Sequence, residues 1–331
     1  MTDHADAQER VDGVAPITAL RDPPLHFKDS FAEHYKELLG ADYERFVDAV
    51  QHYLPKAIRC NPLKQDPKET AARLRAYFVL VPVPWCPDAY WLRGERRDAG
   101  NTVEHQLGYC YVQEAASMIP PVVLAPKRSE RVLDIAASPG SKTTQLSAMM
   151  ENTGVIIAND RGMRLRPLGI NVQKCGCRNV IVTNMDGRAL KRLRVDAALA
   201  DVPCSATGTL QRSPKAALLW RERALASLQQ LQYQLALAAY TALRPGGRMV
   251  YSTCTLEPLE NEGVVTRLIQ NGARVLPIKL PLKREQPFAA YRGVAFHPDV
   301  RHALRIHPYT NGTEGFFVCL LEKPQLTGIQ E

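Results

Sequence analysis

Short apolar runs alternate with helical patterns through the C-terminal two thirds of the chain. The clearest helical pattern covers 221–243, where four leucines fall on one face and a Pro-Gly-Gly stop follows. Five apolar runs each end in small or polar residues, as buried parallel strands do. They are RVLDIAA (131–137), GVIIAND (154–160), NVIVT (179–183), VDAALAD (195–201) and GRMVYST (247–253). This alternation predicts a doubly wound, Rossmann-like α/β domain, whose ligands lie at the carboxyl ends of the strands.

A smaller mixed region precedes that domain. Helical patterns at 29–40, 42–53 and 66–77 alternate with strand-like runs at 56–64 and 78–83. In the first helix, Asp29 or Ser30 fits the N-cap and Gly40 the end. In the third, Asp66 fits the N-cap and Pro67 the first helical position. These patterns predict a compact α+β module.

The predicted organisation has three parts. A flexible N-terminal arm covers 1–27, the small α+β module covers 28–110, and the α/β domain covers 111–325. Within the module, the Pro- and aromatic-rich stretch PVPWCPDAYWLRG (82–94) is interpreted as a surface loop.

Composition is typical of a globular intracellular protein. Of 331 residues, 45% are hydrophobic and 23% charged, which leaves room for about two domains. No apolar run approaches the ~20 residues of a membrane span, and the polar N-terminus is no signal peptide, so we expect a cytoplasmic protein without membrane contact. The eight cysteines never form CxxC pairs, so we expect neither a disulfide framework nor a metal site. Cys175 and Cys177 leave a metal pair open, without other ligands beside them.

Positive charge is concentrated in one segment. The chain carries a formal charge of +8 at a pI of about 9.1, and residues 161–194 hold nine basic residues against the single acid Asp186. Such clustering is what a polyphosphate partner selects for. The charge pattern therefore favours a nucleic-acid partner, although a solvated helix face gives the same pattern.

The loop after the first predicted strand excludes two common nucleotide sites. It reads Asp-Ile-Ala-Ala-Ser-Pro-Gly-Ser-Lys over 134–142. A P-loop needs contiguous Gly-Lys, but Ser141 separates Gly140 from Lys142, and Ile135 occupies the upstream glycine position. The loop has a single glycine, so it lacks the G-x-G-x-x-G of dinucleotide sites.

A small-residue turn before a helix N-terminus remains, and it suits the carboxylate of a methionine. Asp160 ends the second strand, where a ribose diol would be held, and Asp186 follows the third. Acids on successive strands suit an adenosine joined to a cationic sulfonium. The pattern therefore favours S-adenosylmethionine, against the alternative that these acids are only strand-terminal caps.

Two cysteines follow the last two parallel strands. Cys204 lies in Asp-Val-Pro-Cys-Ser (201–205), and Cys254 lies in Ser-Thr-Cys-Thr (252–255). Both are predicted at strand carboxyl ends beside one cleft, next to acids or hydroxyls. Nearby positive charge would favour the nucleophilic thiolate. Most buried cysteines are inert packing, and we interpret Cys60, Cys86, Cys110 and Cys319 in that way.

Several stretches between residues 54 and 323 carry a family resemblance. They are IRCNPLK (58–64), PWCPDAYWLR (84–93), GNTVEHQLGYCYVQEAASMIPP (100–121), VLDIAASPGSKTTQL (132–146), ANDRGMRL (158–165), TNMDG (183–187), DVPCSATGT (201–209), LRPGGRMVYSTCTLEPLENEGVV (243–265) and EGFFVCLLEK (314–323). In combination they resemble the Sun/Nop/Fmu family of RNA (cytosine-5) methyltransferases, most closely its archaeal tRNA members.

The resemblance implies a set of catalytic roles. Cys254 would add to C6 of cytosine, which makes C5 nucleophilic enough to take a methyl group. Asp201 would hydrogen-bond the N3/N4 edge of the base. Cys204 would assist elimination and release of the enzyme, and Lys142 would hold the methionine end or orient the target.

The resemblance also implies the partners. S-adenosylmethionine would be the cofactor, and RNA would be gripped by the N-terminal module, with the target base leaving its stack. tRNA is favoured through the archaeal members, rRNA stays open, and a monomer is expected. The matching cofactor positions are Ala136, Ala137, Ser138, Pro139, Gly140, Ser141, Lys142, Asp160, Arg164, Asp186 and Asp201.

The chain departs from the family pattern in places. Ala206 stands where many members have glycine, and Ser138 and Ser141 replace a common alanine and glycine. The 160–164 loop is one residue shorter than usual, and Pro167 is compatible with the next helix only in its first turn. None of these changes removes a reacting group.

Two rival functions remain. A DNA cytosine-5 methyltransferase would use Cys204 as nucleophile and leave Cys254 without a purpose. A non-catalytic RNA-binding factor would not need Cys254, Cys204, Asp201 and Lys142 together.

Overall fold

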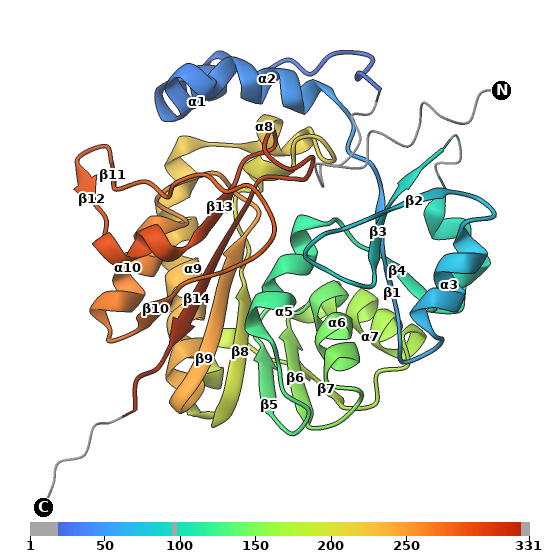
Figure 1. The fold of residues 1–331 in the computed structure, drawn as a ribbon. Coiled ribbons are helices and arrows are strands. Elements are labelled where there is room, and N and C mark those ends of the chain that lie inside the picture. The colour runs from blue at the N-terminus through green and yellow to red at the C-terminus, as the bar shows by residue number, and fades with distance from the viewer. Residues whose placement is uncertain (1–18, 95–97, 326–331) are drawn as a thin grey trace, which may run out of the picture.

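The computed structural model describes residues 19–94 and 98–325 of the chain (Figure 1). A central sheet has the order β10-β14-β9-β8-β5-β6-β7, with β13 beside β14. Its five parallel strands are β5 (Arg131–Asp134), β6 (Val155–Asp160), β7 (Val180–Asn184), β8 (Val195–Asp201) and β9 (Leu243–Thr253). They coincide with the five predicted runs, so the predicted α/β domain is confirmed. The strand order reverses between β5 and β8, which makes their carboxyl ends the expected ligand site.

Three further strands, β14, β10 and β13, extend this sheet beyond β9, and none of them was predicted from the sequence. Because β14 is buried along nearly its whole length, it lacks the two-residue alternation that marks a half-buried strand. It pairs antiparallel with β9, β10 and β13. The bounds are β10 (Arg274–Leu276), β13 (Leu304–Ile306) and β14 (Phe316–Glu322), and a separate hairpin joins β11 (Ala290–Tyr291) to β12 (Val294–Ala295).

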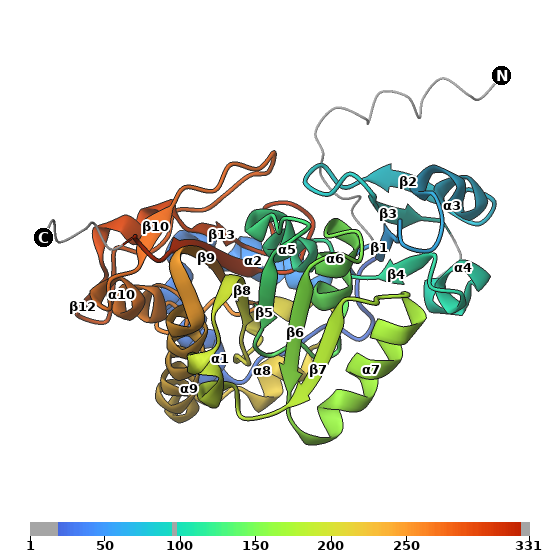
Figure 2. The ribbon, with the colours of Figure 1, turned by 90° about the horizontal axis from the view of Figure 1, so that it is seen from below.

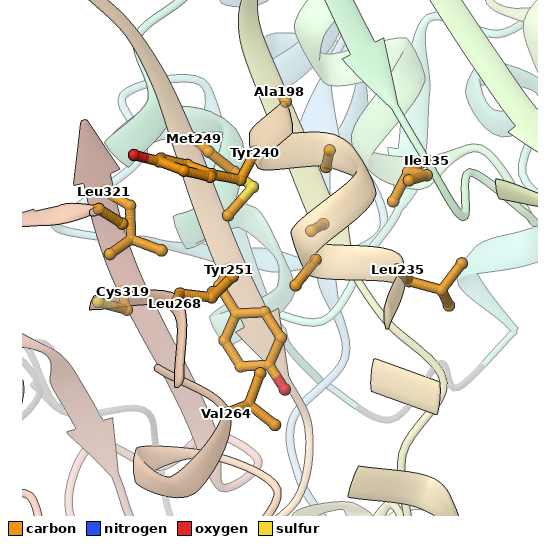
Figure 3. Packing of buried hydrophobic residues seen from close by; sticks show 14 of the residues in the cluster. Ile135, Ala198, Leu235, Tyr240, Met249, Tyr251, Val264, Leu268, Cys319 and Leu321 are labelled. Carbon is orange, nitrogen blue, oxygen red and sulfur yellow. The ribbon is translucent and has the colours of Figure 1, made fainter. Parts of the chain in front are cut away.

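Helices cover both faces of the sheet (Figure 2). One face packs on α5 (Ile119–Leu124), α6 (Ser141–Met149) and α7 (Leu165–Lys174), and the other on α9 (Glu222–Ala242) and α10 (Glu262–Gln270). Neighbouring strand residues point to opposite faces, so Val132 lies in one core and Leu133 in the other. Figure 3 shows the core on the α9 and α10 side, where Tyr251 of β9 lies beside Val264 of α10.

The small module contains a second, antiparallel sheet in the order β2-β3-β1-β4. Its strands and its outer helix are β1 (Ala57–Cys60), β2 (Val79–Pro82), β3 (Ala89–Arg93), β4 (Cys110–Val112) and α3 (Pro67–Leu74), with the short α4 (Val103–Gln106) before β4. Asp66 caps α3 through the N–H groups of Lys68 and Glu69, as predicted. On β1, Ile58 faces α3 whereas Ala57 joins the core of the α/β domain, so this sheet is covered on both sides.

The prediction of a surface loop over 82–94 is wrong. The stretch contains β3, an inner strand, and buries Trp85, Cys86 and Trp91. Prolines and aromatic residues resemble loop composition, but here the two tryptophan rings pack edge to face in the core shared with the α/β domain.

The first two helices lie on another part of the molecule. Figure 1 shows α1 (Asp29–Leu39) and α2 (Tyr43–Gln51) above α8 (Lys215–Leu219), away from β1–β4. Their apolar faces pack against Trp220, Leu256 and Phe296 of the α/β domain. The N-cap of α1 is Lys28 and not Asp29 or Ser30, and Gly40 ends the helix as predicted. The patterns predicted these helices correctly, but the two parts of the predicted module pack on different regions of the α/β domain.

Of the arm predicted over 1–27, residues 1–18 lie outside the described residues, and residues 19–27 make contacts with the first two helices. Arg21 donates its N–H to the Gln51 carbonyl at 2.7 Å, and Leu25 exchanges hydrogen bonds with the Gln51 side chain. Phe27 stacks near Phe31. In the described part of the chain, no helix combines the length and apolar character needed to cross a bilayer.

Candidate active site

The two cysteine turns lie side by side. Because β8 and β9 are parallel neighbours with Asp201 opposite Ser252, the residues that follow them emerge at the same sheet edge. The Sγ atoms of Cys204 and Cys254 are 3.4 Å apart, within reach of a thiol–thiolate hydrogen bond, and both residues are half-buried. The structure thus places both cysteines together at the carboxyl ends of adjacent strands, as predicted.

Cys204 is the member of the pair that keeps its proton. Its hydrogen bond to Cys254, then burial and the neighbouring charges of Cys254 and Glu260 hold the pKa of the Cys204 thiol well above its usual range. A neutral Cys204 can donate S–H to Cys254 and stabilise a thiolate there. The 3.4 Å distance fits a hydrogen bond in either direction, and the raised pKa of Cys204 favours Cys204 as the donor.

A buried ion pair faces the cysteines. The Lys142 Nζ lies 2.6 Å from the Asp201 Oδ2 and 3.0 Å from the Ser117 Oγ. Burial lowers the pKa of Lys142, but the Asp201 carboxylate and the nearby Cys254 raise it above its usual value, so the ammonium stays charged. Ser252 donates its Oγ–H to the Asp201 Oδ1 at 2.8 Å, which fixes the carboxylate from its other side.

Asp134, at the end of β5, is a further buried acid close to Asp201 and Lys142. It accepts the Thr143 hydroxyl at 2.7 Å. Burial raises the pKa of Asp134 to about 7, and the charge of Asp201 adds to the rise while Thr143 and Lys142 oppose it. In the sequence, Asp134 stands at the start of the loop without any signal that predicts this role.

The loop over 136–142 fits the amino-acid end of S-adenosylmethionine. The α6 helix begins after Gly140 without any side-chain cap, so its first N–H groups are available to a carboxylate. Gly140 has φ +100°, and an added Cβ would lie 3.0 Å from Leu168. Ala137 donates its N–H to the Asn159 carbonyl at 2.8 Å, which ties the loop to the end of β6. Ser138 donates its hydroxyl to the Arg164 carbonyl, and its bond to Pro139 is cis.

The predicted cofactor acids are brought to adjacent strand ends but are already hydrogen-bonded. Asp160 accepts the N–H of Ser138 on Oδ2 at 2.9 Å, whereas its Oδ1 accepts the N–H of Arg161 and forms an ion pair with Arg164. Since a carboxylate oxygen accepts two hydrogen bonds, Oδ2 keeps one acceptor position for a ribose hydroxyl.

Asp186 and Arg164 have structural partners. Asp186 accepts three hydrogen bonds from Arg188 and one, at 3.4 Å, from Arg161, and the Arg188 bonds lower its pKa to about 2. Arg164 bridges Asp160 and the Ser138 carbonyl, so it braces the cofactor loop. The helix α7 begins at Leu165, which places Pro167 in its first turn, as the sequence required.

The turn that follows Cys204 packs closely against the backbone at Cys254 and Gly315. Gly208 donates its N–H to the Cys254 carbonyl at 2.9 Å, and an added Cβ there would lie 2.2 Å from the Gly315 oxygen. Ala206 has φ +57°, the left-handed region that favours glycine. The departure noted at Ala206 therefore falls on a residue whose backbone conformation suits the glycine of many family members.

Several site residues were missed by the sequence analysis. Ser117 and Ser252 hold the ion pair, and two neighbouring acids, the half-buried Glu114 and the buried Glu314, are connected to it through Ser117. Glu114 accepts the N–H groups of Ala116, Ser117 and Glu314, and burial together with Glu314 raises its pKa to about 8. All four residues lie in stretches quoted for the resemblance, but one sequence gives no signal that separates them from packing residues.

Arg212 is another residue that was not predicted from the sequence, and it forms an ion pair with Glu314. It donates to both Glu314 oxygens, at 2.5 and 3.2 Å. Its side chain is 65% exposed while that of Glu314 is 2% exposed, so one face of the guanidinium is left open. The charge of Cys254 raises the pKa of Arg212, after its larger interactions with Glu314 and Glu114 and against the effect of burial.

The remaining cysteines are free thiols away from the site. Burial raises the pKa of Cys86 to about 11 and those of Cys60 and Cys110 to about 12, which suits the predicted packing role. Within residues 19–94 and 98–325, no three His, Cys, Asp or Glu side chains group together as metal ligands would.

Comparisons with known proteins agree with this geometry. Residues 121–322 match the family model of 16S rRNA methyltransferase RsmB/F, and residues 27–115 match the N-terminal domain of 16S rRNA methyltransferase RsmF. The tRNA (cytosine(49)-C(5))-methyltransferase of Pyrococcus abyssi is 40% identical over 91% of this chain and 100% of its own length. Ribosomal RNA small subunit methyltransferase F of Enterobacter sp. is 38% identical over 90% of this chain, which spans 64% of that longer relative.

Solved structures show the same fold. A methyltransferase homolog protein from Pyrococcus horikoshii superposes with a TM-score of 0.81 at 34% identity, over 90% of this chain and 96% of its own. NSun6 from Pyrococcus horikoshii has a TM-score of 0.76 at 24% identity, over 90% of this chain and 99% of its own, and shares the fold. The chain therefore belongs to the RsmB/F family, the Sun/Nop/Fmu family of S-adenosylmethionine-dependent RNA (cytosine-5) methyltransferases that the sequence motifs indicate.

Proposed function

We propose that this protein methylates C5 of a cytosine in tRNA through a covalent adduct on Cys254. The observation that carries the proposal is the pairing of Cys204 and Cys254 at 3.4 Å beside the Lys142–Asp201 ion pair. It supplies a nucleophile, a neutral thiol, a carboxylate and a cation at one sheet edge. The similarity to the archaeal tRNA enzyme over its full length supports the substrate.

Attack on the base is prepared by three side chains. The Lys142 ammonium supplies the positive charge that lets Cys254 attack C6 as a thiolate, and the Cys204 thiol, 3.4 Å from Cys254, is a further donor that the attack does not require. Each Asp201 oxygen already accepts one hydrogen bond, from Lys142 or Ser252, and keeps a second acceptor position. Asp201 can therefore accept the N4–H of cytosine and hold the base as C6 becomes bonded to sulfur.

Release reverses the addition. S-adenosylmethionine, when bound, supplies the methyl group that C5 of the adduct takes up. C5 must then lose its proton to a water molecule, and the electron pair of that C–H bond re-forms the C5–C6 double bond as Cys254 leaves C6 as a thiolate. Cys204 is the nearest sulfur to Cys254, and we assign it to assist this elimination.

The residues at 136–142, with Asp160, would hold the cofactor. The open N-terminus of α6 suits its carboxylate, and the free acceptor position of Asp160 suits a ribose hydroxyl. Asp186 and Arg164 brace this region in the present structure, so we assign them to shaping the loop.

The RNA is proposed to contact the small module over 28–110 and the basic segment over 161–194. A target base inside a helix cannot reach sulfur atoms at a sheet edge, so it would have to leave its stack. A cytoplasmic location and a monomeric state stay predictions.

Trapping of the adduct tests the chemistry. Incubation of the Cys204→Ala protein with tRNA and S-adenosylmethionine is expected to accumulate a protein–RNA band that survives denaturing gels, because attack proceeds but release fails. Trapping by Cys254→Ala instead would reverse the roles, as in a DNA-type enzyme. No adduct from either variant, together with no methyl transfer by the wild type, would favour a non-catalytic RNA-binding factor.

An rRNA substrate is the second candidate, because the RsmF relatives are named for the small ribosomal subunit. Bisulfite sequencing of tRNA and rRNA after reaction with the purified protein separates the two. We expect protected cytosines in tRNA, and protection confined to 16S rRNA would contradict the tRNA assignment.

A further inference from the structure

A buried carboxylate holds the turn that carries Cys204. Glu260 is fully buried, and its two oxygens face Ser205, the residue after Cys204. Ser205 donates its N–H to Oε2 at 3.0 Å and its hydroxyl to Oε1 at 2.5 Å. Burial raises the pKa of Glu260 to about 7, and the hydrogen bonds from Ser205 and Gln232 oppose the rise. In the mechanism proposed above, Glu260 touches neither the base nor the cofactor, and its charge acts only by helping to raise the pKa of Cys204.

The residue before Cys204 is held by the same group through Gln232 of α9. The Gln232 Nε2 lies 2.5 Å from the Glu260 Oε2 and 3.0 Å from the Pro203 carbonyl oxygen. An amide nitrogen has two N–H bonds, so one can point to each acceptor. Glu260 and Gln232 together therefore fix the backbone on both sides of Cys204, and we call these two residues the clamp.

The clamp also links the two cysteine turns. Glu260 belongs to the segment that follows Cys254, six positions later in the sequence. Tyr251 of β9 donates its hydroxyl to the Glu260 carbonyl at 2.5 Å, which fixes Glu260 relative to β9. The Ser205 Oγ lies 2.6 Å from the Thr255 Oγ1, next to Cys254. The 3.4 Å spacing of the sulfur atoms thus depends on a network that Glu260 anchors.

We infer that Glu260, with Gln232, is a positioning residue that holds Cys204 for the release step, while attack by Cys254 does not depend on it. The inference rests on the proposed function, because it assigns the clamp to the step that Cys204 serves. Lys142, Asp201 and Ser252, which prepare the attack, make no hydrogen bond to Glu260 or Gln232 among the described residues. Loosening the clamp should therefore slow release and leave adduct formation intact.

The test measures, for each variant, the amount of protein–RNA adduct that accumulates and the rate at which methylated RNA is released. Glu260→Gln keeps the shape of the side chain. It replaces one carboxylate oxygen by an NH₂ group, which would face the donors of Ser205 and Gln232. With full-length protein, tRNA transcript and S-adenosylmethionine, we expect kcat to fall about tenfold, the magnitude of one lost charge-assisted hydrogen bond. The gel-stable adduct should form at the wild-type rate and accumulate, and the KM for tRNA should stay within twofold.

Matched variants separate this role from a general loss of stability. Glu257→Gln removes another buried carboxylate of the same segment, whose partners are His34, Tyr35 and Trp220, and it should lower stability without adduct accumulation. Gln232→Ala breaks the clamp from α9 and should accumulate adduct as Glu260→Gln does, and it serves alone if Glu260→Gln does not fold.

Two results would overturn the inference. One is a parallel loss of adduct and product in the clamp variants, which would place Glu260 in the attack. The other is turnover within twofold of wild type. The Cys204→Ala protein is run beside them: if it also fails to trap RNA, the proposed function itself is wrong, whereas trapping by Cys204→Ala alone contradicts only the clamp.

Discussion

At single positions, burial and the neighbouring charges decide which groups keep a proton. Cys204 lies 3.4 Å from Cys254, and its pKa is raised by the hydrogen bond to Cys254, by burial and by the charges of Cys254 and Glu260. Lys142 is buried and still charged, because Asp201 offsets the cost of desolvation. Identical residue types therefore acquire different roles from their surroundings, and no sequence spacing alone expresses this difference.

Asp134 gives a pH-dependent prediction. Its pKa rises from 3.8 to about 7 on folding, mainly through burial, so the folded state binds a proton that the unfolded state has lost. The contribution of Asp134 is therefore most favourable below pH 4 and is lost as the pH rises to 7. Asp134→Asn stays neutral and can still accept the Thr143 hydroxyl. The free energy of unfolding of Asp134→Asn, taken relative to wild type, should therefore increase by up to about 2 kcal/mol as the pH rises from 5 to 8.

Urea denaturation of both proteins at the two pH values measures this difference. Thr143→Val, which removes the hydrogen bond but keeps the carboxyl group, serves as control and should retain the wild-type fall with pH. Parallel stability curves for Asp134→Asn and wild type would contradict the assigned protonation of Asp134.

Among the secondary-structure elements, α1 is tied to the loop that carries Cys254. Glu257, three residues after Cys254, accepts hydrogen bonds from His34 at 2.9 Å, Tyr35 at 2.9 Å and Trp220 at 3.0 Å. Tyr35 and Glu257 are both buried. The helix thus contributes donors to a carboxylate that would otherwise be buried at high cost.

Tyr35→Phe tests this tie. The substitution removes one donor to a buried carboxylate and leaves the ring stacked on Phe31 and Phe46, so we expect a loss of about 1.5–3 kcal/mol in the free energy of unfolding. Tyr43→Phe on the neighbouring helix is the matched control and should change stability by less than about 0.5 kcal/mol. Chemical denaturation monitored by tryptophan fluorescence measures both, and equal losses would contradict the role of the Tyr35 hydroxyl.

The sequence predicts some elements well for a physical reason. Parallel strands are buried on both faces, so each one appears in the sequence as a continuous apolar run. Because ligands bind at the carboxyl ends of such strands, the sequence predicted that Cys204 and Cys254 lie at the same site. The amphipathic face of α1 shows that it packs, but not that its partner is Trp220 more than 180 positions away. Glu260 was not identified because a buried acid has no pattern distinct from that of a surface acid. Its donors come from residues distant in sequence.

In the whole molecule, the excess charge lies at one edge of the central sheet. Residues 161–194 form α7, β7 and the 3-10 helix Gly187–Arg192, and β7 is the edge strand. Acids offset some of this charge, because Asp160 and Asp186 pair with Arg161, Arg164 and Arg188. Five exposed basic residues have no ion-pair partner in the part of the chain that the structure describes. They are Arg166, Arg178, Lys191, Arg192 and Arg194.

These unpaired charges predict how binding to RNA depends on salt. Each basic side chain that neutralises a phosphate releases condensed counterions, which contributes about 0.7 to the slope of log K against log salt for single strands. Lys191→Gln/Arg192→Gln should therefore make the slope shallower by about 1.4 and raise the KM for tRNA, with kcat unchanged because neither residue lies in the site. Arg301→Gln is the matched control, because it also removes an exposed basic charge. Arg301 lies next to β10, beyond the opposite edge of the sheet, so this variant should leave the slope at the wild-type value. Equal slopes for the double variant and wild type would mean that RNA crosses another face, and the charge at the β7 edge would then serve only solubility.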